Sequence, residues 1–477
     1  MGINLDWQVE SEQTHMQATE DPEAKYRRRR ARLRLLLLMA VVGGVLLVIV
    51  GLILWRLGQV EDQYRQDLLD TVEAEVVALR VGNFANYMAV KRSASDAFML
   101  EQSRQYEEYQ RLKETHRVEL RGEVVSVTID NLRARVVVKE EIDGVPYKVV
   151  WFYWYYEDTG EGGDQGGWRR VPDDLTFWGD EHRLTRGPVR IQYHEMDTDL
   201  AKALAPKLEG WWTQGCQVLQ CITAPPTLTV DIVAERPSAV EWASYDPWTL
   251  RVTSPLVGRA RADTPLSVEL EQAIAQQIAS RLVRFSAGDV PPLAYSDAAW
   301  WYAEISRWLS ETLLTGGVPT NPGFTGSLIA QFGPGAPGAI LRAVGTDSRL
   351  DDTIPYVTAT SLGQMTVEQL NALDWRGFFQ WRLELEMRLL AQPDSSGAFL
   401  ALYDLEDPVT ATQAQVRSQD ATYAAQPIPQ VSTVVIAREE SGTYAYVEAS
   451  TTINEQATPL TVIWRLTGGT WKRRVTG

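Results

Sequence analysis

Residues that could hold a catalytic metal are few in this sequence. No two of its four histidines share one turn of a helix, and these are His15, His116, His182 and His194. The pair His194-Glu195 begins like the zinc motif H-E-x-x-H, in which two imidazoles bind the metal and the glutamate activates water. Thr198 stands where the second histidine would be, so we predict no metal site in this segment.

A second segment has the spacing of a zinc helix without its chemistry. In "QAIAQQIASRLV" and the residues before it, apolar side chains recur every four positions from Leu270 to Leu282, which predicts an amphipathic helix. Gln276 and Ser280 lie one turn apart beside this stripe, with Gln277 between them. A neutral amide and a hydroxyl bind Zn²⁺ weakly, and Gln277 cannot act as a general base.

Other catalytic motifs are missing as well. The sequence has no phosphate-binding glycine loop, and the segment around Ser327 lacks the second glycine of a G-x-S-x-G nucleophile turn. The acidic pairs Asp173-Asp174 and Glu439-Glu440 are typical of turns or of the surface. We therefore predict no catalytic residue, no bound metal and no cofactor.

One strand offers a candidate ligand pocket. In "WFYWYY" the side chains of Trp151, Tyr153 and Tyr155 point to one face and those of the alternate residues to the other, because side chains alternate along a strand. Either face could line a cavity. The alternative is that the strand is aromatic because both of its faces are core.

The only two cysteines, Cys216 and Cys221, stand in "GCQVLQC". A lone pair at this spacing with no histidine nearby makes a poor zinc site, so we expect a small local disulfide rather than a metal. Two free thiols are the alternative.

A membrane span is the clearest structural prediction. Residues 35–55 carry no charged side chain, and 21 residues at about 1.5 Å each cross about 30 Å of hydrocarbon. Six arginines precede the apolar run, which predicts a cytoplasmic N-terminus and an outside location for everything after residue 56. No small-residue cleavage site follows, so an uncleaved anchor is favoured over a removed signal peptide.

The charge balance bears on partners. A formal net charge of -16 argues against a general nucleic-acid binder, because phosphate binding needs clustered lysine and arginine. A membrane and a protein or peptide ligand are the partners that we expect.

Two parts of the outer region resemble each other. The segment 72–90 aligns with 383–402, which places Glu75 beside Glu386, and "GGWRRV" aligns with "GTWKRRV" near the end of each copy. Each copy runs from helices into alternating strands, an α+β arrangement. This pattern resembles the nuclear-transport-factor-2-like (cystatin-like) fold, a cone of sheet and helices that can hold a ligand, catalyse isomerisation or pair with a protein.

The region between the copies resembles the gluzincin (peptidase MA-like) metallopeptidases. The resemblance rests on the order of strands and helices over 190–380, on "RWLSETL" and on "SLGQMTVEQLNALDWRGFFQW". It places Gln276 and Ser280 at the positions of the two histidines and Gln277 at that of the catalytic glutamate. Glu311 takes the position of the third zinc ligand. Only Glu311 is retained, so the resemblance implies a vestigial site.

These observations predict an α+β protein with a single transmembrane helix and three extracytoplasmic domains. The expected parts are a cytoplasmic tail (1–34), the span (35–56), a first cone-like domain (57–192), a degenerate gluzincin-like domain (193–380) and a second cone-like domain (381–477). The expected function is non-catalytic binding of a protein, peptide or envelope ligand at a bacterial-type cell surface. The alternatives are a hydrolase with unrecognised catalytic groups, an isomerase in one cone, and transmembrane signalling.

Overall fold

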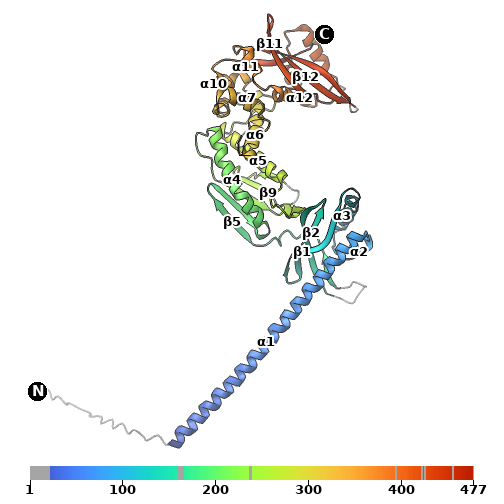
Figure 1. Ribbon diagram of the computed structural model, residues 1–477, viewed down its shortest axis with the longest axis vertical. Helices are drawn as coiled ribbons and strands as arrows, with labels where there is room; N and C mark the ends of the chain where they lie inside the picture. The colour runs from blue at the N-terminus through green and yellow to red at the C-terminus, as the bar shows by residue number, and fades with distance from the viewer. Residues whose placement is uncertain are drawn as a thin grey trace, which may run out of the picture. The chain divides into compact units, whose positions relative to one another are not determined.

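The computed structural model describes residues 22–157, 166–235, 239–317, 319–392, 395–420, 423, 426–453 and 456–475. The chain contains helices and three β-sheets, whose strands are mostly antiparallel. The fold is therefore mixed α+β (Figure 1). His15 lies outside the described residues.

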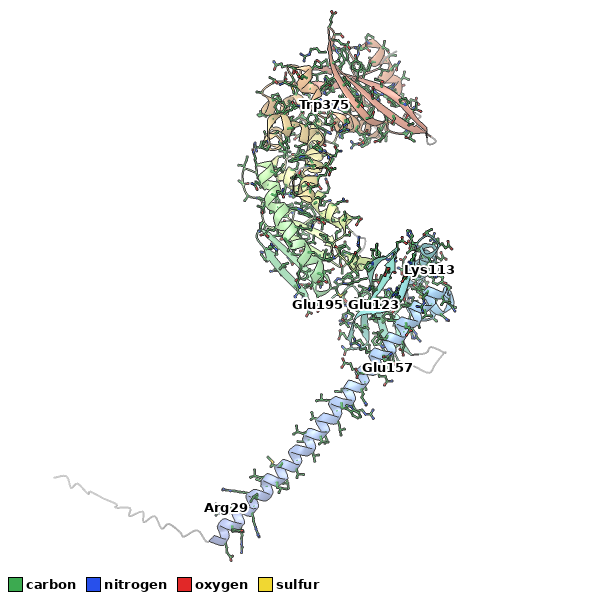
Figure 2. All side chains as sticks on the ribbon, in the orientation of Figure 1. Arg29, Lys113, Glu123, Glu157, Glu195 and Trp375 are labelled. Carbon is green, nitrogen blue, oxygen red and sulfur yellow. A yellow bond between two sulfur atoms is a disulfide. The ribbon has the colours of Figure 1, made fainter. Side chains whose placement is uncertain are left out.

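The first helix, α1 (Pro22–Val81), is the only described helix that is long and apolar enough to cross a membrane. Its large apolar side chains between Leu35 and Leu57 are exposed, as are the arginines near its start, of which Arg29 is labelled in Figure 2. From Leu68 onward, α1 instead buries a stripe of apolar side chains in the protein core. The apolar run predicted to span the membrane is therefore part of one continuous helix that continues into the folded region.

The first sheet follows two further helices, α2 (Phe84–Ala89) and α3 (Asp96–Thr115). Its strands are β1 (Val118–Asp130), β2 (Arg133–Ile142), β3 (Val145–Tyr156) and β4 (Gly167–Arg170), in the order β1-β2-β3, with β4 paired to β3. The turn between β2 and β3 uses Asp143 and Gly144, both with positive φ, as a tight hairpin requires.

The second sheet combines parallel and antiparallel pairs. Its strands are β5 (Glu181–Arg186), β6 (Val189–His194), β7 (Leu228–Val233), β8 (Val240–Trp242) and β9 (Thr249–Thr253). The order is β5-β6-β7-β9-β8, and the central pairs β6–β7 and β7–β9 are parallel. Residue 193, where the second expected domain begins, lies inside β6.

Helix α4 (Thr198–Leu219), preceded by the short helix η1 (Glu195–Asp197), connects β6 to β7. After β9 comes η2 (Pro255–Val257) and a two-residue strand, β10 (Ala260–Arg261), which pairs with Tyr147 and Lys148 of β3. The chain thus returns to the first sheet before it forms the long helices.

A helical region follows. Helix α5 (Val268–Ser286) matches the amphipathic helix predicted from apolar spacing, and α6 (Asp297–Thr315) follows it. The glycine-rich segment after them forms α7 (Gly323–Phe332) and α8 (Ala336–Ala343). The short helices α9 (Leu350–Thr353), α10 (Pro355–Thr358) and α11 (Val367–Asn371) lead to α12 (Arg376–Leu390).

The last region holds α13 (Ser396–Leu400), α14 (Pro408–Arg417) and an antiparallel sheet. Its strands β11 (Gln430–Glu439), β12 (Gly442–Ile453), β13 (Gln456–Thr467) and β14 (Thr470–Arg474) pair in sequence order. Trp375, labelled in Figure 2, packs edge to face against Trp471 of β14, with ring centroids 5.7 Å apart. One hydrophobic core therefore joins α5–α12 to this sheet.

Candidate functional site

The helix that resembles a zinc helix has its hydrophobic face fully used for packing. Ser267 caps α5 by accepting a hydrogen bond from the Leu270 N–H, and Ile274 and Ile278 are completely buried. Gln276 is exposed and donates from Nε2 to Ser280 Oγ over 3.4 Å, the contact that a spacing of one turn predicts. The two side chains therefore hydrogen-bond to each other on the surface of α5.

Glu311, at the expected third-ligand position on α6, accepts a hydrogen bond from Arg307 Nη1 over 2.8 Å. Arg307 also pairs with Glu304, one turn earlier, and donates to the Asn321 carbonyl. In the described residues, the hydrogen bonds of Glu311 stay on its own helix and do not reach Gln276 or Ser280.

The side chains of the described histidines have separate partners. His116 Nδ1 is 2.6 Å from Asp143 Oδ2 at an exposed turn, His182 stacks beside Tyr193, and His194 contacts the Gly179 carbonyl. Within the described part of the chain, no cluster of three or more His, Cys, Asp or Glu side chains could hold a metal ion.

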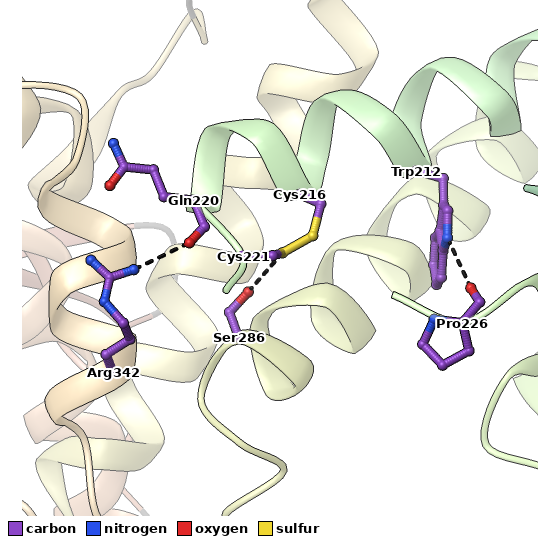
Figure 3. The surroundings of a disulfide bond; sticks show 7 residues. All are labelled: Trp212, Cys216, Gln220, Cys221, Pro226, Ser286 and Arg342. Atoms are coloured by element: carbon purple, nitrogen blue, oxygen red, sulfur yellow. Dashed lines mark hydrogen bonds between the residues drawn. A yellow bond between two sulfur atoms is a disulfide. The ribbon is translucent and has the colours of Figure 1, made fainter. Parts of the chain in front are cut away.

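The predicted disulfide is present between Cys216 and Cys221, whose Cα atoms are 5.2 Å apart (Figure 3). It closes the end of α4, where Gln220 adopts a left-handed conformation and its carbonyl accepts from Arg342. The Cys221 sulfur also contacts the Ser286 hydroxyl at the end of α5. The disulfide therefore fixes how α4 ends beside α5.

The aromatic strand is largely core. Trp151 and Tyr153 are buried, and Tyr155 packs against Tyr64 of α1 with ring centroids 4.7 Å apart. The Tyr153 hydroxyl donates to Glu75 Oε2 over 2.9 Å. On the face that could line a pocket, Tyr153 and Tyr155 thus contact α1 directly, whereas Trp154 on the other face is 47% exposed.

Glu75 of α1, which the sequence singles out only by its alignment with Glu386, is the centre of a buried polar cluster. Its carboxylate forms ion pairs with Lys91 and with Arg170 Nη1, the latter over 2.8 Å. Burial lowers the pKa of Lys91 to about 7, because desolvation and the nearby Arg170 outweigh the attraction of Glu75. Burial also raises the pKa of Tyr153 well above its usual range.

Glu386 of α12 is the centre of a second buried cluster. It forms an ion pair with Arg473 and accepts hydrogen bonds from the hydroxyls of Tyr403 and Tyr423, the latter over 2.9 Å. Arg473 Nη1 also donates to Tyr423 Oη over 3.1 Å. Burial opposes the charge of Arg473, but Glu386 and the two tyrosines outweigh it and raise the pKa of the guanidinium.

The two clusters are built in the same way. Arg170 donates its N–H to the Val90 carbonyl and accepts from the Arg92 N–H, over 2.7 and 2.9 Å. Arg473 does the same with Leu402 and Asp404, over 2.8 and 2.9 Å. Lys91 in the first cluster and Tyr403 in the second are the residues between these partners, and each forms a parallel bridge with its arginine. The alignment of "GGWRRV" with "GTWKRRV" was the signal that could have identified both arginines.

A cavity of about 470 Å³ lies between the start of α6 and the last sheet. Its lining comes from residues 295–297, from Asp347 and Arg349, from Arg382 of α12, and from parts of 398–402 and 467–472. Arg382 Nη2 donates to Asp297 Oδ1 over 2.8 Å, and both side chains are almost completely buried. Nothing in the sequence indicated this cavity, because its walls come from segments far apart along the chain.

No protein-family model matches the sequence, and a search of curated proteins finds no matching relative.

Proposed function

We propose that the chain is a membrane-anchored, extracytoplasmic, non-catalytic protein that binds a ligand through a region shaped like a gluzincin peptidase. Two cone-like domains flank this region. The N-terminus lies in the cytoplasm and the span is passed once.

The anchor and its orientation are supported by the exposed apolar surface of α1 and by the arginines before it. An exposed apolar band of this length is stable in lipid and costly in water. Arginines cluster on the cytoplasmic side of a span, so they favour an inside N-terminus.

The observation that carries the non-catalytic proposal is how the vestigial zinc positions are used. Gln276 bonds to Ser280, and Glu311 bonds to Arg307. A positive guanidinium on the one retained carboxylate opposes binding of a cation there. Gln277 stands at the position of the catalytic base, and its neutral amide cannot take a proton from water at neutral pH.

The binding proposal is supported by the cavity at the start of α6. Asp297 and Glu311 are 14 residues apart on one helix, hence about 20 Å along its axis. The cavity therefore lies away from the vestigial zinc positions. A volume of about 470 Å³ falls in the range of about 300–1,000 Å³ usual for small-ligand pockets.

The cone-like assignment is supported by the shared construction of the two clusters. In each copy a buried glutamate of a helix pairs with an arginine that follows a tryptophan in the last, short strand. Both short strands pair with the end of a longer neighbour, Tyr153–Tyr156 in β3 and Ile463–Thr467 in β13.

Zinc analysis of the purified full-length chain in lipid nanodiscs tests the proposal. After dialysis against Zn²⁺ and then metal-free buffer, we expect well below one zinc per chain and no metal-dependent peptide hydrolysis. Stoichiometric zinc that is lost in Glu311→Ala would overturn the non-catalytic proposal. Lys202→Ala, at an exposed position of α4, is the control for non-specific changes.

A further inference from the structure

We propose that the cavity between α6 and the last sheet binds a monocarboxylate with a short apolar body. This inference rests on the proposed binding function and names the ligand class. Two sources share the chemistry, a free short-chain carboxylic acid and the C-terminal end of a peptide.

Two hydrogen-bond donors in the wall of the cavity have no partner among the residues that the structure describes. Arg382 is 4% exposed, and its Nε has no hydrogen-bond partner among the described residues. The same holds for the buried hydroxyl of Thr467. Buried polar groups are normally hydrogen-bonded, because a donor buried without a partner destabilises the fold. Two such groups in the wall of one cavity indicate an acceptor-rich ligand.

The hairpin between β13 and β14 places further donors beside them. Thr467 pairs with Thr470 across the hairpin, and Lys472 follows two residues later, so all three lie on one face of it. Within the described part of the chain, the Lys472 ammonium has neither an ion pair nor a hydrogen bond, although it lines the cavity. An ammonium next to two hydroxyls and a guanidinium suits a carboxylate.

The hairpin is held in place on the cavity. Gly468 and Gly469, which form its turn, both have positive φ, and the Gly468 carbonyl accepts from Arg349 Nη1 over 3.0 Å. A Cβ at Gly469 would lie 2.5 Å from the Cβ of Asp351, so only glycine fits this close approach. The backbone of the hairpin that carries Thr467 and Lys472 is therefore held in place before any ligand arrives, which reduces the entropy lost on binding.

The charge of the lining favours a single negative charge on the ligand. Among the charged lining residues, Arg382 is paired with Asp297 and Arg349 with Asp352, which leaves Lys472 as the lining cation without an ion pair in the described part of the chain. Asp297 is already neutralised by Arg382, whereas Asp347 is exposed. The remaining carboxylates would repel a dianion such as phosphate more than a monocarboxylate.

The remaining lining residues determine the size and polarity of the rest of the ligand. Ala398, Ala401 and Leu402, from α13 and the residues after it, supply small apolar surface. A cavity of about 470 Å³ holds a short chain or one to two side chains, but not a folded partner.

Calorimetric titration of the full-length chain in nanodiscs tests the inference with two matched pairs of probes. Hexanoate is compared with hexanamide, and the acetylated tripeptide Ala-Ala-Leu with a free carboxylate is compared with its C-terminal amide. We expect at least one acid to bind about tenfold or more tightly than its amide, because the amide loses the charge-assisted hydrogen bonds. The acid that binds identifies the source.

Variants connect binding to the cavity. Lys472→Met and Thr467→Val each keep most of the side-chain volume, and we expect an affinity loss of about tenfold for the first and a smaller loss for the second. Lys202→Met, an exposed lysine on α4, is the matched control and should bind as the wild type does. Equal thermal melting of all variants excludes unfolding as the cause.

Equal binding of acid and amide, no binding of either acid, or an unchanged affinity in Lys472→Met would overturn the inference. These results would leave the non-catalytic proposal intact. Zinc-dependent cleavage of the tripeptide would instead contradict the proposed function, so the two failures are distinguishable.

Discussion

Loss of the Glu386 charge tests the second buried cluster most sharply. The Glu386 side chain is 1% exposed and that of Arg473 is 12% exposed, so Glu386→Gln leaves a nearly buried guanidinium without its counter-charge. Removing one partner of a buried pair costs about 3–5 kcal/mol, far more than the pair contributes as a whole. The glutamine oxygen still accepts from Tyr403 and Tyr423, which places the expected loss near the lower figure, about 3 kcal/mol.

The assay is urea unfolding followed by tryptophan fluorescence, because Trp464 and Trp471 are fully buried in the same sheet. For a folding unit of about 150–250 residues, a loss of about 3 kcal/mol corresponds to a fall in Tm of about 6–12 °C. Glu406→Gln is the control, since Glu406 is 70% exposed in its pair with Arg465 and should change stability by less than about 1 kcal/mol.

A double-mutant cycle separates the ion pair from other effects of the substitution. Glu386→Gln combined with Arg473→Met removes both charges, so we expect the double variant to be more stable than the sum of the two single losses predicts. A loss below about 0.5 kcal/mol for Glu386→Gln, or simple additivity in the cycle, would refute the reasoning.

Three further predictions follow from other parts of the chain. Because the pKa of Lys91 is about 7 when folded and 10.5 when unfolded, the unfolded state binds more protons between these values. The stability of the first region should therefore rise with pH from 7 to about 10, by at most about 1.4 kcal/mol per pH unit, and Lys91→Met should remove this slope in urea melts. Replacing both Cys216 and Cys221 with serine opens a loop with a sequence separation of only 5, so the expected loss of stability is about 2 kcal/mol, matched by reduction of the wild type but absent on reduction of the variant. In intact cells, an impermeant thiol reagent should label a single cysteine placed at exposed Leu132 of the cysteine-free variant but not one placed at Arg29; the opposite pattern would contradict the proposed orientation.

Periodicity predicted the long elements well because their signal is local. The stripe from Leu270 to Leu282 gave α5, and the uninterrupted apolar run gave the membrane-length part of α1. The unbroken connection between the span and the helix expected from residue 72 was not predicted, because the polar section between them carries no sustained apolar stripe. The pairing of β10 with β3 joins residues more than 100 positions apart, which no local pattern reveals.

The polar sites were harder to predict because they depend on distant pairs. Glu75 and Glu386 stood out as aligned positions, but their arginines lie 95 and 87 residues further along the chain. The contact between Gln276 and Ser280 was predictable because i and i+4 positions meet on any helix. The cavity was not, since its donors come from α12 and from the last hairpin.

Restoring the zinc ligands tests the central claim most directly, that the α5–α6 region is a peptidase-shaped region without metal chemistry. The triple variant Gln276→His, Gln277→Glu and Ser280→His recreates H-E-x-x-H on α5 and leaves Glu311 in place. Zinc content of the full-length chain in nanodiscs should be near zero for the wild type and near one per chain for the triple variant, and Glu311→Ala should weaken the latter. One zinc per wild-type chain, lost with Glu311→Ala, would contradict the absence of metal chemistry, and no zinc in a folded triple variant would contradict the peptidase-like geometry.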